Sequence, residues 1–457
     1  MRRLAALALF TSVGVLAACT DPHNSLVTDE PVASFDLAAS HGRFGGPPSI
    51  IPFTGDAACL DNGQILMDPT DEPFQLPAGW TQKIITFEDD FLTTNTEVNF
   101  DMLTLNETGP HAGRYLYRTH EVDDYAALSR VDLLTGTSTL VAERQDWESF
   151  DGLAWTPWGT ILMAEEVITA SFRDPQYPNI VRGLIYEYNP ATGDVKALPA
   201  VGARSHEGLR FDSQGNLYGI SESRGIANAG KPGESGAIFK FVPTRKGDLS
   251  AGKLYALKVR NGQTRTGEAT WVELKLDQTT FDSDAAAQAV GATGWDRPED
   301  IEITRQGNSD VMYVGVTESS NLAKNNGLVL KIVLRSSTFA VVSNYVLPGT
   351  NVPHEVADPV WGSDAGLGFD DPDNVEVLPN GDVLINEDDS PSDTWIARGS
   401  GPMATTVVEF SRLLDCGAET TGVYYDKFRR ILYMNSQHAA LHGGRDLTVA
   451  IYPPKGQ

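Results

Sequence analysis

Short runs of alternating apolar and polar residues, broken by Gly, Asn, Asp and Pro, fill the chain from about residue 75 to its end. Alternation with a period of two indicates strands that bury one face. Only residues 283–290 carry a short helical pattern, and no amphipathic helical stretch competes with the strands. The pattern therefore predicts an all-β fold with one short helix.

The strand pattern repeats along the chain. Each repeat has an alternating strand, a polar turn and a second strand that ends in an acid or, in the last copy, a histidine; a further strand follows. The six hairpins span Asp101–Glu121, Leu153–Glu166, Leu209–Glu222, Ile301–Glu318, Val375–Asp388 and Val423–His438. Units at spacings of roughly 50 to 90 residues predict a six-bladed β-propeller, with insertions at 242–295 and 335–372.

The charge narrows the range of functions. The 457 residues include 35 Lys and Arg against 61 Asp and Glu, a formal net charge of −26. The apolar fraction of 41% excludes a mostly disordered chain. So acidic a surface repels phosphate backbones, which excludes a general role in binding nucleic acid. It suits a protein that gathers divalent cations, whose ligands are mainly carboxylate oxygens.

The N-terminal segment has the features of an export signal. Arg2 and Arg3 precede an apolar run too short to span a bilayer, and Leu16-Ala-Ala-Cys19 resembles a bacterial lipobox. We expect a lipoprotein signal at 1–18, lipidation of Cys19, a tether at 19–50 and a folded domain at 51–457. A plain secretory signal is the alternative. Thr20 after the Cys favours the outer membrane, and the lipid would be the sole membrane attachment, because no later apolar run is long enough.

Two cysteines remain in the mature chain, Cys59 and Cys416. In an oxidising compartment they are candidates for one disulfide, and two unpaired buried thiols are the alternative.

Acids recur at equivalent ends of the predicted strands. Asp151, Glu207, Glu299-Asp300 and Asp373 stand just before inner strands; Glu121, Glu165-Glu166, Glu222, Glu318, Glu387–Asp389 and Gln437-His438 stand where second strands end. In a propeller these positions converge on one mouth of the central channel. So many carboxylates stay ionised only if cations neutralise them, which predicts a multinuclear Ca²⁺ or mixed-metal site. Metal-bound water or hydroxide would then be the nucleophile toward a phosphate.

Several of these motifs have a second interpretation. Arg297-Pro-Glu-Asp300 fits a loop held by a surface salt bridge, and Glu387–Asp389 fits a solvated acidic run. His120 and His206, each before a Glu, are core histidines or substrate-binding groups. Asn435-Ser-Gln437-His438 fits a cap against the first blade. No nucleophile elbow, phosphate-binding loop or dinucleotide fingerprint is present.

The blocks together resemble the PhoX-type alkaline phosphatases. The matching blocks are Thr119-His-Glu121, Gly159–Glu166, Ser205-His-Glu-Gly208, Arg297-Pro-Glu-Asp300, Asp373-Asn374 with Asn386-Glu-Asp388, and Asn435–His438. The resemblance implies a six-bladed propeller and a calcium-dependent phosphomonoesterase with a mixed iron–calcium cluster. It implies that Glu207 and Glu299 are catalytic metal ligands and that Arg297, with His120 and His206, binds the substrate phosphate. The full candidate ligand set is Glu121, Glu165, Glu166, Glu207, Glu299, Asp300, Asp373 and Glu387.

Two departures from the family pattern change what is expected. The family carries an iron-binding Cys where this chain has Ala164, so the iron centre is in doubt and calcium alone becomes an option. Thr119 replaces an Asn beside a phosphate contact. We therefore keep two alternatives: a non-catalytic, calcium-stabilised surface propeller that binds a ligand, and a calcium-dependent lactonase or esterase. A monomer acting on a small phosphoester is expected.

Overall fold

The computed structural model describes residues 72–454 except 96, 223–235, 263, 319–325, 354–355, 359–361, 389–391, 400, 416 and 440–444. The contacts divide the chain into Met1–His41 and Gly42–Gln457, and everything below concerns the second unit. Cys19, Cys59 and Cys416 lie outside the described residues, so lipidation and the disulfide stay predictions. Among the described residues, no helix has the length and apolar character needed to cross a membrane.

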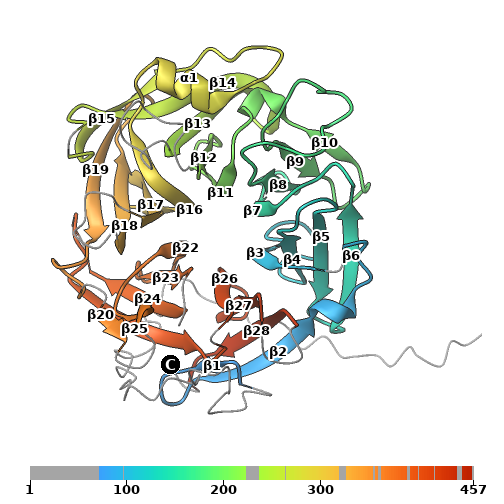
Figure 1. Ribbon diagram of the computed structural model, residues 1–457, viewed down its shortest axis with the longest axis vertical. Helices are drawn as coiled ribbons and strands as arrows, with labels where there is room; N and C mark the ends of the chain where they lie inside the picture. Colours follow the sequence, from blue (N-terminus) through green and yellow to red (C-terminus); the bar gives the residue numbers. More distant parts are fainter. Residues whose placement is uncertain are drawn as a thin grey trace, which may run out of the picture. The chain divides into compact units, whose positions relative to one another are not determined.

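Antiparallel sheets make up nearly all of the described chain, in the propeller-like arrangement of Figure 1. The sheet nearest the N-terminus in sequence holds β3 (Phe100–Leu105), β4 (Tyr115–His120), β5 (Ala127–Asp132) and β6 (Thr137–Glu143). The next holds β7 (Phe150–Trp155), β8 (Ile161–Glu165), β9 (Ile185–Tyr188) and β10 (Val195–Ala197). The all-β prediction is confirmed.

A nine-stranded sheet occupies the middle of the sequence. Its strands are β11 (His206–Phe211), β12 (Leu217–Ser221), β13 (Gly236–Arg245), β14 (Asp248–Val259), β15 (Gly267–Glu273), β16 (Gly294–Gln306), β17 (Ser309–Glu318), β18 (Asn326–Leu334) and β19 (Phe339–Val346). The insertion at 242–295 supplies β15, which pairs with both β14 and β19. Pairing of β13 with β16 then closes seven of the strands on themselves, so this region is not two separate sheets.

Two further sheets complete the ring. One holds β22 (Pro372–Val377), β23 (Val383–Glu387), β24 (Asp393–Arg398), β25 (Thr406–Leu413) and β1 (Phe74–Gln75). The other holds β26 (Glu419–Asp426), β27 (Ile431–Gln437), β28 (Leu447–Tyr452) and β2 (Thr81–Phe87). Because β2 comes from the start of the described chain and β28 from its end, their pairing fastens the ring.

The remaining elements are short. β20 (Val356–Asp358) pairs with β21 (Gly362–Leu367), and two 3₁₀ turns span η1 (Glu88–Asp90) and η2 (Pro199–Val201). The predicted helix at 283–290 is confirmed as α1 (Ser283–Ala289). The Asp282 side chain caps it by accepting a hydrogen bond from the Ala285 N–H.

The core lies between neighbouring sheets. Leu103 and Leu116 of the first sheet pack with Tyr433 of the last, and Leu162 packs with Leu209 across the next boundary. Alternation along each strand therefore serves two cores, one on each face of a sheet.

The innermost strands of the ring are β3, β7, β11, β16, β22 and β26, and each contacts the next around the centre (Figure 1). Each has a register irregularity against its neighbour, and all six fall at the same place. They lie between Phe100 and Leu103, Phe150 and Leu153, His206 and Leu209, Pro298 and Ile301, Pro372 and Val375, and Thr421 and Tyr424. A bulge redirects side chains out of the ladder, so these irregularities decide what faces the channel.

Candidate metal centre

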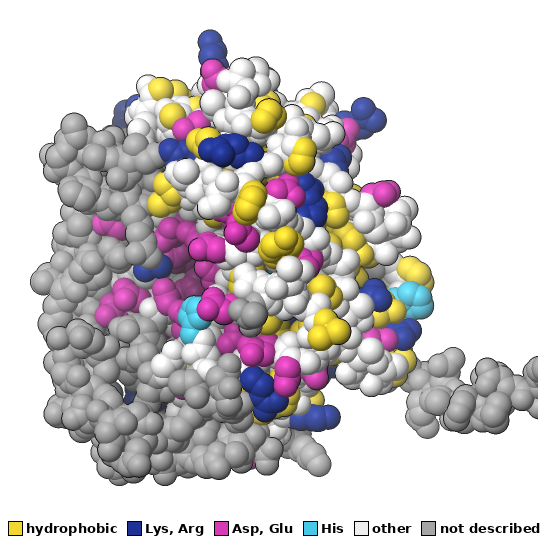
Figure 2. Space-filling model, turned by 45° about the vertical axis from the view of Figure 1, so that its right-hand side comes forward, with side chains coloured by type: hydrophobic (Ala, Val, Ile, Leu, Met, Phe, Trp, Pro, Cys, Tyr) yellow, Lys and Arg dark blue, Asp and Glu magenta, His cyan; other side chains and the backbone are white. Residues whose placement is uncertain are grey.

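A cavity of about 210 Å³ lies at the end of the channel where the inner strands begin. Among the described residues, ten carboxylates line it, together with one guanidinium and one imidazole. They are Asp101, Glu121, Asp151, Glu166, Glu207, Glu222, Glu299, Asp373, Asp388 and Glu419, with Arg297 and His438; Thr421 and Gln437 complete the wall. Figure 2 shows such a gathering of acidic side chains, with a histidine among them.

The first group of acids comes from the bulges of the inner strands. Five bulges place an acid in the cavity: Asp101, Asp151, Glu207, Glu299 and Asp373. The sixth bulge has Gly422 at this position, where an added Cβ would lie 2.4 Å from the Asp101 carbonyl oxygen. The ring of inner acids is therefore open at one strand.

The second group stands immediately after the second strands. Glu121, Glu166, Glu222, Asp388 and His438 each follow the last residue of β4, β8, β12, β23 or β27. In four cases the N–H of this residue donates to the carbonyl of the residue two before the inner acid, at 2.7–3.2 Å. Three of those four acceptor residues, Asn99, Ser149 and Asp371, have a left-handed backbone. This bond joins the two groups of acids.

The last residues of β8 and β23 face the other way, because side chains alternate along a strand. Glu165 and Glu387 were predicted as ligands, and neither lines the cavity. The Leu184 N–H donates to Glu165 at 2.8 Å, while Glu387 accepts from the Trp395 indole N–H at 2.7 Å. Both carboxylates hold loops in place, and we leave them out of the proposed site.

Asp300, also predicted as a ligand, lies beside Glu299 but outside the cavity. Its oxygens accept hydrogen bonds from the Ile301 N–H at 2.7 Å and the Val375 N–H at 3.1 Å. It thus ties β16 to β22, two inner strands that do not pair in a ladder. Asp300 lies between the strands because it is one residue beyond Glu299, the acid of the bulge.

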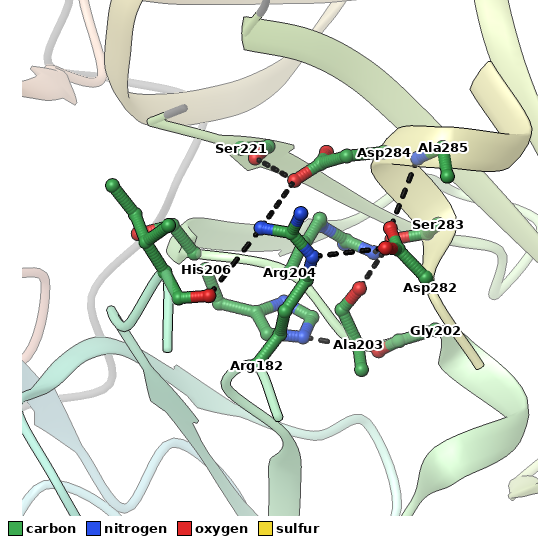
Figure 3. A network of polar contacts seen from close by, with 12 residues as sticks. Arg182, Gly202, Ala203, Arg204, His206, Ser221, Asp282, Ser283, Asp284 and Ala285 are labelled. Carbon is green, nitrogen blue, oxygen red and sulfur yellow. Dashed lines mark hydrogen bonds and ion pairs between the residues drawn. The ribbon is translucent and has the colours of Figure 1, made fainter. Parts of the chain in front are cut away.

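The two predicted substrate-binding histidines are buried away from the cavity. His120 Nε2 lies 2.8 Å from the Ser129 hydroxyl, and its ring packs edge-on against Phe91 and Phe100. His206 Nε2 lies 3.1 Å from the Gly202 carbonyl oxygen, beside the polar network of Arg204 in Figure 3. Burial lowers the pKa of both imidazoles well below the ordinary value. A neutral buried ring does not attract phosphate, so neither remains in the proposed site.

The network around Arg204 fixes the start of β11 instead. The Arg204 guanidinium is buried and donates to the Ile220 carbonyl at 3.0 Å and the Val201 carbonyl at 3.1 Å (Figure 3). Asp284 of α1 accepts from the Ser221 hydroxyl at 3.1 Å. Since Glu207 lies on β11 and Glu222 directly follows Ser221, this network supports the backbone of two cavity acids.

Arg297 is the guanidinium of the cavity. Its backbone is left-handed, with φ of +46°, at the position two before an inner acid where Asn99, Ser149 and Asp371 are also left-handed. Its Nε lies 2.7 Å from Glu222 and 3.0 Å from Glu299, and its Nη2 lies 3.3 Å from Asp388. The shared turn geometry thus aims one cation into the middle of the acids.

The ionised form of these acids is unfavourable, because they are buried and lie close to one another. Burial, followed by the charges of neighbouring carboxylates, raises the pKa of Asp101, Asp373 and Glu166 well above ordinary values. Burial is also the first cause for Asp151, Glu207 and Glu299, although Arg297 lowers the pKa of Glu299. Asp151 Oδ1 and Glu207 Oε2 are buried without a hydrogen-bond partner in the described structure. Orphaned, crowded carboxylate oxygens fit hard cations such as Ca²⁺.

Three carboxylates form the tightest candidate ligand group. One oxygen each of Glu166, Glu207 and Glu222 lies within 4.8 Å of the other two. Hydroxyls and an amide orient their neighbours: Ser205 donates to Glu166 at 3.0 Å, Thr317 to Glu299 at 3.1 Å and Gln437 to Glu121 at 2.9 Å. The arrangement can hold more than one divalent cation beside a group that binds anions.

Sequence reasoning selected Glu121, Glu166, Glu207, Glu299, Asp373 and Arg297, and the structure brings all six together. It named the positions of Asp151, Glu222, Asp388 and His438 without selecting them. Asp101 and Glu419 carried no motif. The equivalence of Asp101 with Asp151 would have been found from the spacing to the hairpin turn, whereas nothing in the repeat marks Glu419.

Ala164, at the position of the family's cysteine, is fully buried on β8. It lies on the same face of the strand as Glu166 and packs with Ala154, Leu162 and Leu209. The methyl group offers no ligand atom, so the described residues here do not fit an iron held by a thiolate.

Fold and cavity define a class: an all-β, propeller-like protein with an acidic centre suited to divalent cations at one end of its channel. The chain belongs to the alkaline phosphatase PhoX family, whose model matches residues 152–440. This membership supports a phosphatase of the PhoX type. No curated protein matches the chain.

The chain is similar to two solved structures, of which the first supports the fold. Pseudomonas fluorescens PhoX in complex with vanadate, a transition state analogue, is 17% identical, with 84% of this chain and 97% of that chain covered at a TM-score of 0.58. The PQQ-bound aldose sugar dehydrogenase of Streptomyces coelicolor is 13% identical, with 83% and 100% covered at a TM-score of 0.42.

Proposed function

We propose that this protein is a calcium-dependent phosphomonoesterase whose reaction takes place in the acidic cavity. The carrying observation is the convergence of ten carboxylates on one guanidinium, with two orphaned carboxylate oxygens among them. Family membership supports the reaction class, and the all-oxygen ligand set supports calcium.

Glu166, Glu207 and Glu222 are the first residues we assign to a cation, and Asp101, Glu299 and Asp373 are assigned to further cations. When bound, such cations would polarise the phosphoryl group and lower the pKa of a water molecule. Arg297 would exchange part of its present pairing with Glu222, Glu299 and Asp388 for two phosphate oxygens, which its planar fork matches. Ser205, Thr317 and Gln437 hold the carboxylates in place.

The test is p-nitrophenyl phosphate hydrolysis by the purified full-length chain, stripped of metal and reloaded. We expect Ca²⁺ alone to restore turnover, because Ala164 removes the thiolate that would hold iron. A requirement for iron as well would mean that other ligands replace the thiolate, and would overturn calcium-only catalysis. Absence of turnover under every loading would overturn the phosphatase.

Ala164 also favours a second candidate, a propeller that binds a ligand without catalysis. In that case Ca²⁺ would raise the melting temperature while no phosphoester or lactone is hydrolysed. A calcium-dependent lactonase would be recognised by one bound calcium per chain and by turnover of lactones only.

The proposal extends to organisation and location. The nine-stranded sheet contains two four-stranded runs, β11–β14 and β16–β19, and counting each as a blade gives six. We propose export through residues 1–18, acylation of Cys19, a tether to residue 50 and a monomer anchored in the outer membrane. Globomycin-sensitive processing and palmitate labelling that is lost in Cys19→Ser would test the anchor.

A further inference from the structure

A second and larger cavity, of about 870 Å³, lies where the same inner strands end. All six contribute to its wall, through Thr104, Ala154, Arg210, Glu302, Glu376 and Tyr424. The first five stand three positions after the bulge position that faces the metal centre, and Tyr424 stands two positions after Gly422. Its volume falls within the range of about 300–1,000 Å³ that is usual for ligand sites.

The charges of this cavity are paired inside the protein, with one exception. Arg210 pairs with Glu302 and also donates to the Leu209 carbonyl at 2.8 Å. Glu107 accepts from the Tyr424 hydroxyl at 2.7 Å and from the Lys427 ammonium at 2.8 Å.

Glu376 is the exception. Its side chain lines the cavity and is only 8% exposed, yet no described residue forms a hydrogen bond or ion pair with it. Burial, and then the charge of Glu302, raises its pKa well above the ordinary value, while Arg210 acts in the opposite direction. Because Arg210 is already paired with Glu302, one positive charge faces two carboxylates, and a cationic ligand would supply the missing charge.

The geometry argues against a bare metal ion. Among the described residues, the acids of this cavity do not bring three ligand atoms within 4.8 Å of one another, as Glu166, Glu207 and Glu222 do. The residues of its wall instead include the aromatic Trp155, Phe211 and Tyr425. Aromatic rings beside a carboxylate are suited to an ammonium group with organic substituents.

We propose that this second cavity binds a small organic cation, whose ammonium group pairs with Glu376 and packs against the aromatic wall. The assignment is independent of the phosphatase reaction at the other end of the channel. The site would recognise its ligand by charge and by apolar contact together.

Isothermal titration calorimetry on the full-length, calcium-loaded protein tests this with choline and ethanolamine as probes. We expect at least one of them to bind with a dissociation constant below about 1 mM. The neutral isostere of choline, in which a tert-butyl group replaces the trimethylammonium group, should bind at least about tenfold more weakly, because it lacks the charge.

Glu376→Gln should weaken binding about tenfold or more without unfolding the protein, since it removes a buried charge and keeps the side chain's size. Glu273→Gln on β15, an exposed glutamate paired with Lys253, is the matched control and should leave binding unchanged. Equal binding of the neutral isostere, unchanged affinity in Glu376→Gln, or no binding of either ammonium probe would overturn the proposal.

Discussion

The two ends of the channel are built by the same six strands and differ in how charge is balanced. At one end, five bulges present acids, and among the described residues Arg297 and His438 oppose ten carboxylates. At the other end, about three residues further along, Glu302 and Glu107 are paired with Arg210 and Lys427, and Trp155, Phe211 and Tyr425 are among the residues of the wall. We propose that the first end is balanced by bound cations, whereas the charges of the second end are nearly balanced by its own residues.

The difference shows what the backbone decides and what the side chains decide. The bulge repeats in all six strands, so the backbone makes every strand equivalent. The side chains then make the two ends differ: on β7, Asp151 places a carboxylate in the acidic cavity, whereas Ala154 places a methyl group in the second cavity. A comparison of substitutions at matched positions on one strand can therefore separate metal binding from stability.

The largest effect is expected for Glu299→Gln on β16, set against Glu302→Gln on the same strand. Loss of the Glu299 charge should lower turnover of p-nitrophenyl phosphate about a hundredfold or more and reduce the metal bound per chain. Glu302→Gln should keep turnover within about twofold but lower the free energy of unfolding, because it strands Arg210. Turnover per folded chain, metal content and urea denaturation are the measurements.

A reversed outcome, in which Glu302→Gln abolishes turnover and Glu299→Gln does not, would place the reaction at the other end. Equal loss in both variants would mean that the two ends are coupled through β16. Glu273→Gln provides the baseline for an exposed acid.

Metal removal should make stability depend on pH in a defined direction. Asp101, Asp151 and Glu207 have pKa values raised in the metal-free fold, so this fold binds more protons than the unfolded chain at pH values above their ordinary pKa. Stability must then fall as pH rises. The pKa of Glu419 is raised to about 8, which extends the decline to that pH.

His438 acts in the same direction. A hydrogen bond to Glu419 raises its pKa to about 9, so its contribution is complete below its ordinary pKa and is lost as pH rises through 9. We expect the melting temperature of the chelator-treated protein to fall between about pH 5 and pH 9, and Ca²⁺ to restore more of it at the higher pH. A melting temperature of the metal-free chain that rises over this interval would contradict the crowding of acids.

Much of the acidic end could be predicted from the sequence, because acids at strand ends recur along the chain, whereas the second cavity was not predicted. Two of the selected residues lie one position before a residue that lines the cavity: Glu387 before Asp388, and Glu165 before Glu166. Since a shift of one residue turns a side chain to the opposite face, the register of a strand end decides the site, and register depends on bulges that the repeat does not display. The state of Glu376 could not be predicted from its own strand, because whether it has a partner depends on residues that five other strands contribute.

Position 422, where a glycine interrupts the ring of inner acids, should not tolerate any side chain. Gly422 has φ of +61°, and an added Cβ would lie 2.4 Å from the Asp101 carbonyl oxygen and 2.8 Å from the Asn435 side-chain nitrogen. Gly422→Ala should therefore lower the free energy of unfolding by about 2–4 kcal/mol. The control Gly136→Ala has φ of +72° with open space around it and should cost about 1 kcal/mol.

Urea denaturation of the calcium-loaded variants measures both values. An equal loss in the two variants would mean that the backbone conformation alone matters. The close approach of β26 to β3 would then not explain why a glycine interrupts the ring of inner acids at this strand.

The smallest effect on stability, and the sharpest test of metal choice, is expected for Ala164→Cys. The new thiol would lie on the face of β8 that carries Glu166, beside Gly152 and the Glu207 backbone. One added sulfur atom should change the free energy of unfolding by about 1 kcal/mol or less, while a thiolate beside carboxylates should raise the iron bound per chain after loading. The matched control is Ala154→Cys on β7, which lines the second cavity and should bind no additional iron. Iron retention in Ala164→Cys alone would show that the acidic end keeps the geometry of a mixed-metal centre and lacks only its soft ligand; equal retention in both variants would mean that any buried thiol suffices, and would remove position 164 as the reason for calcium preference.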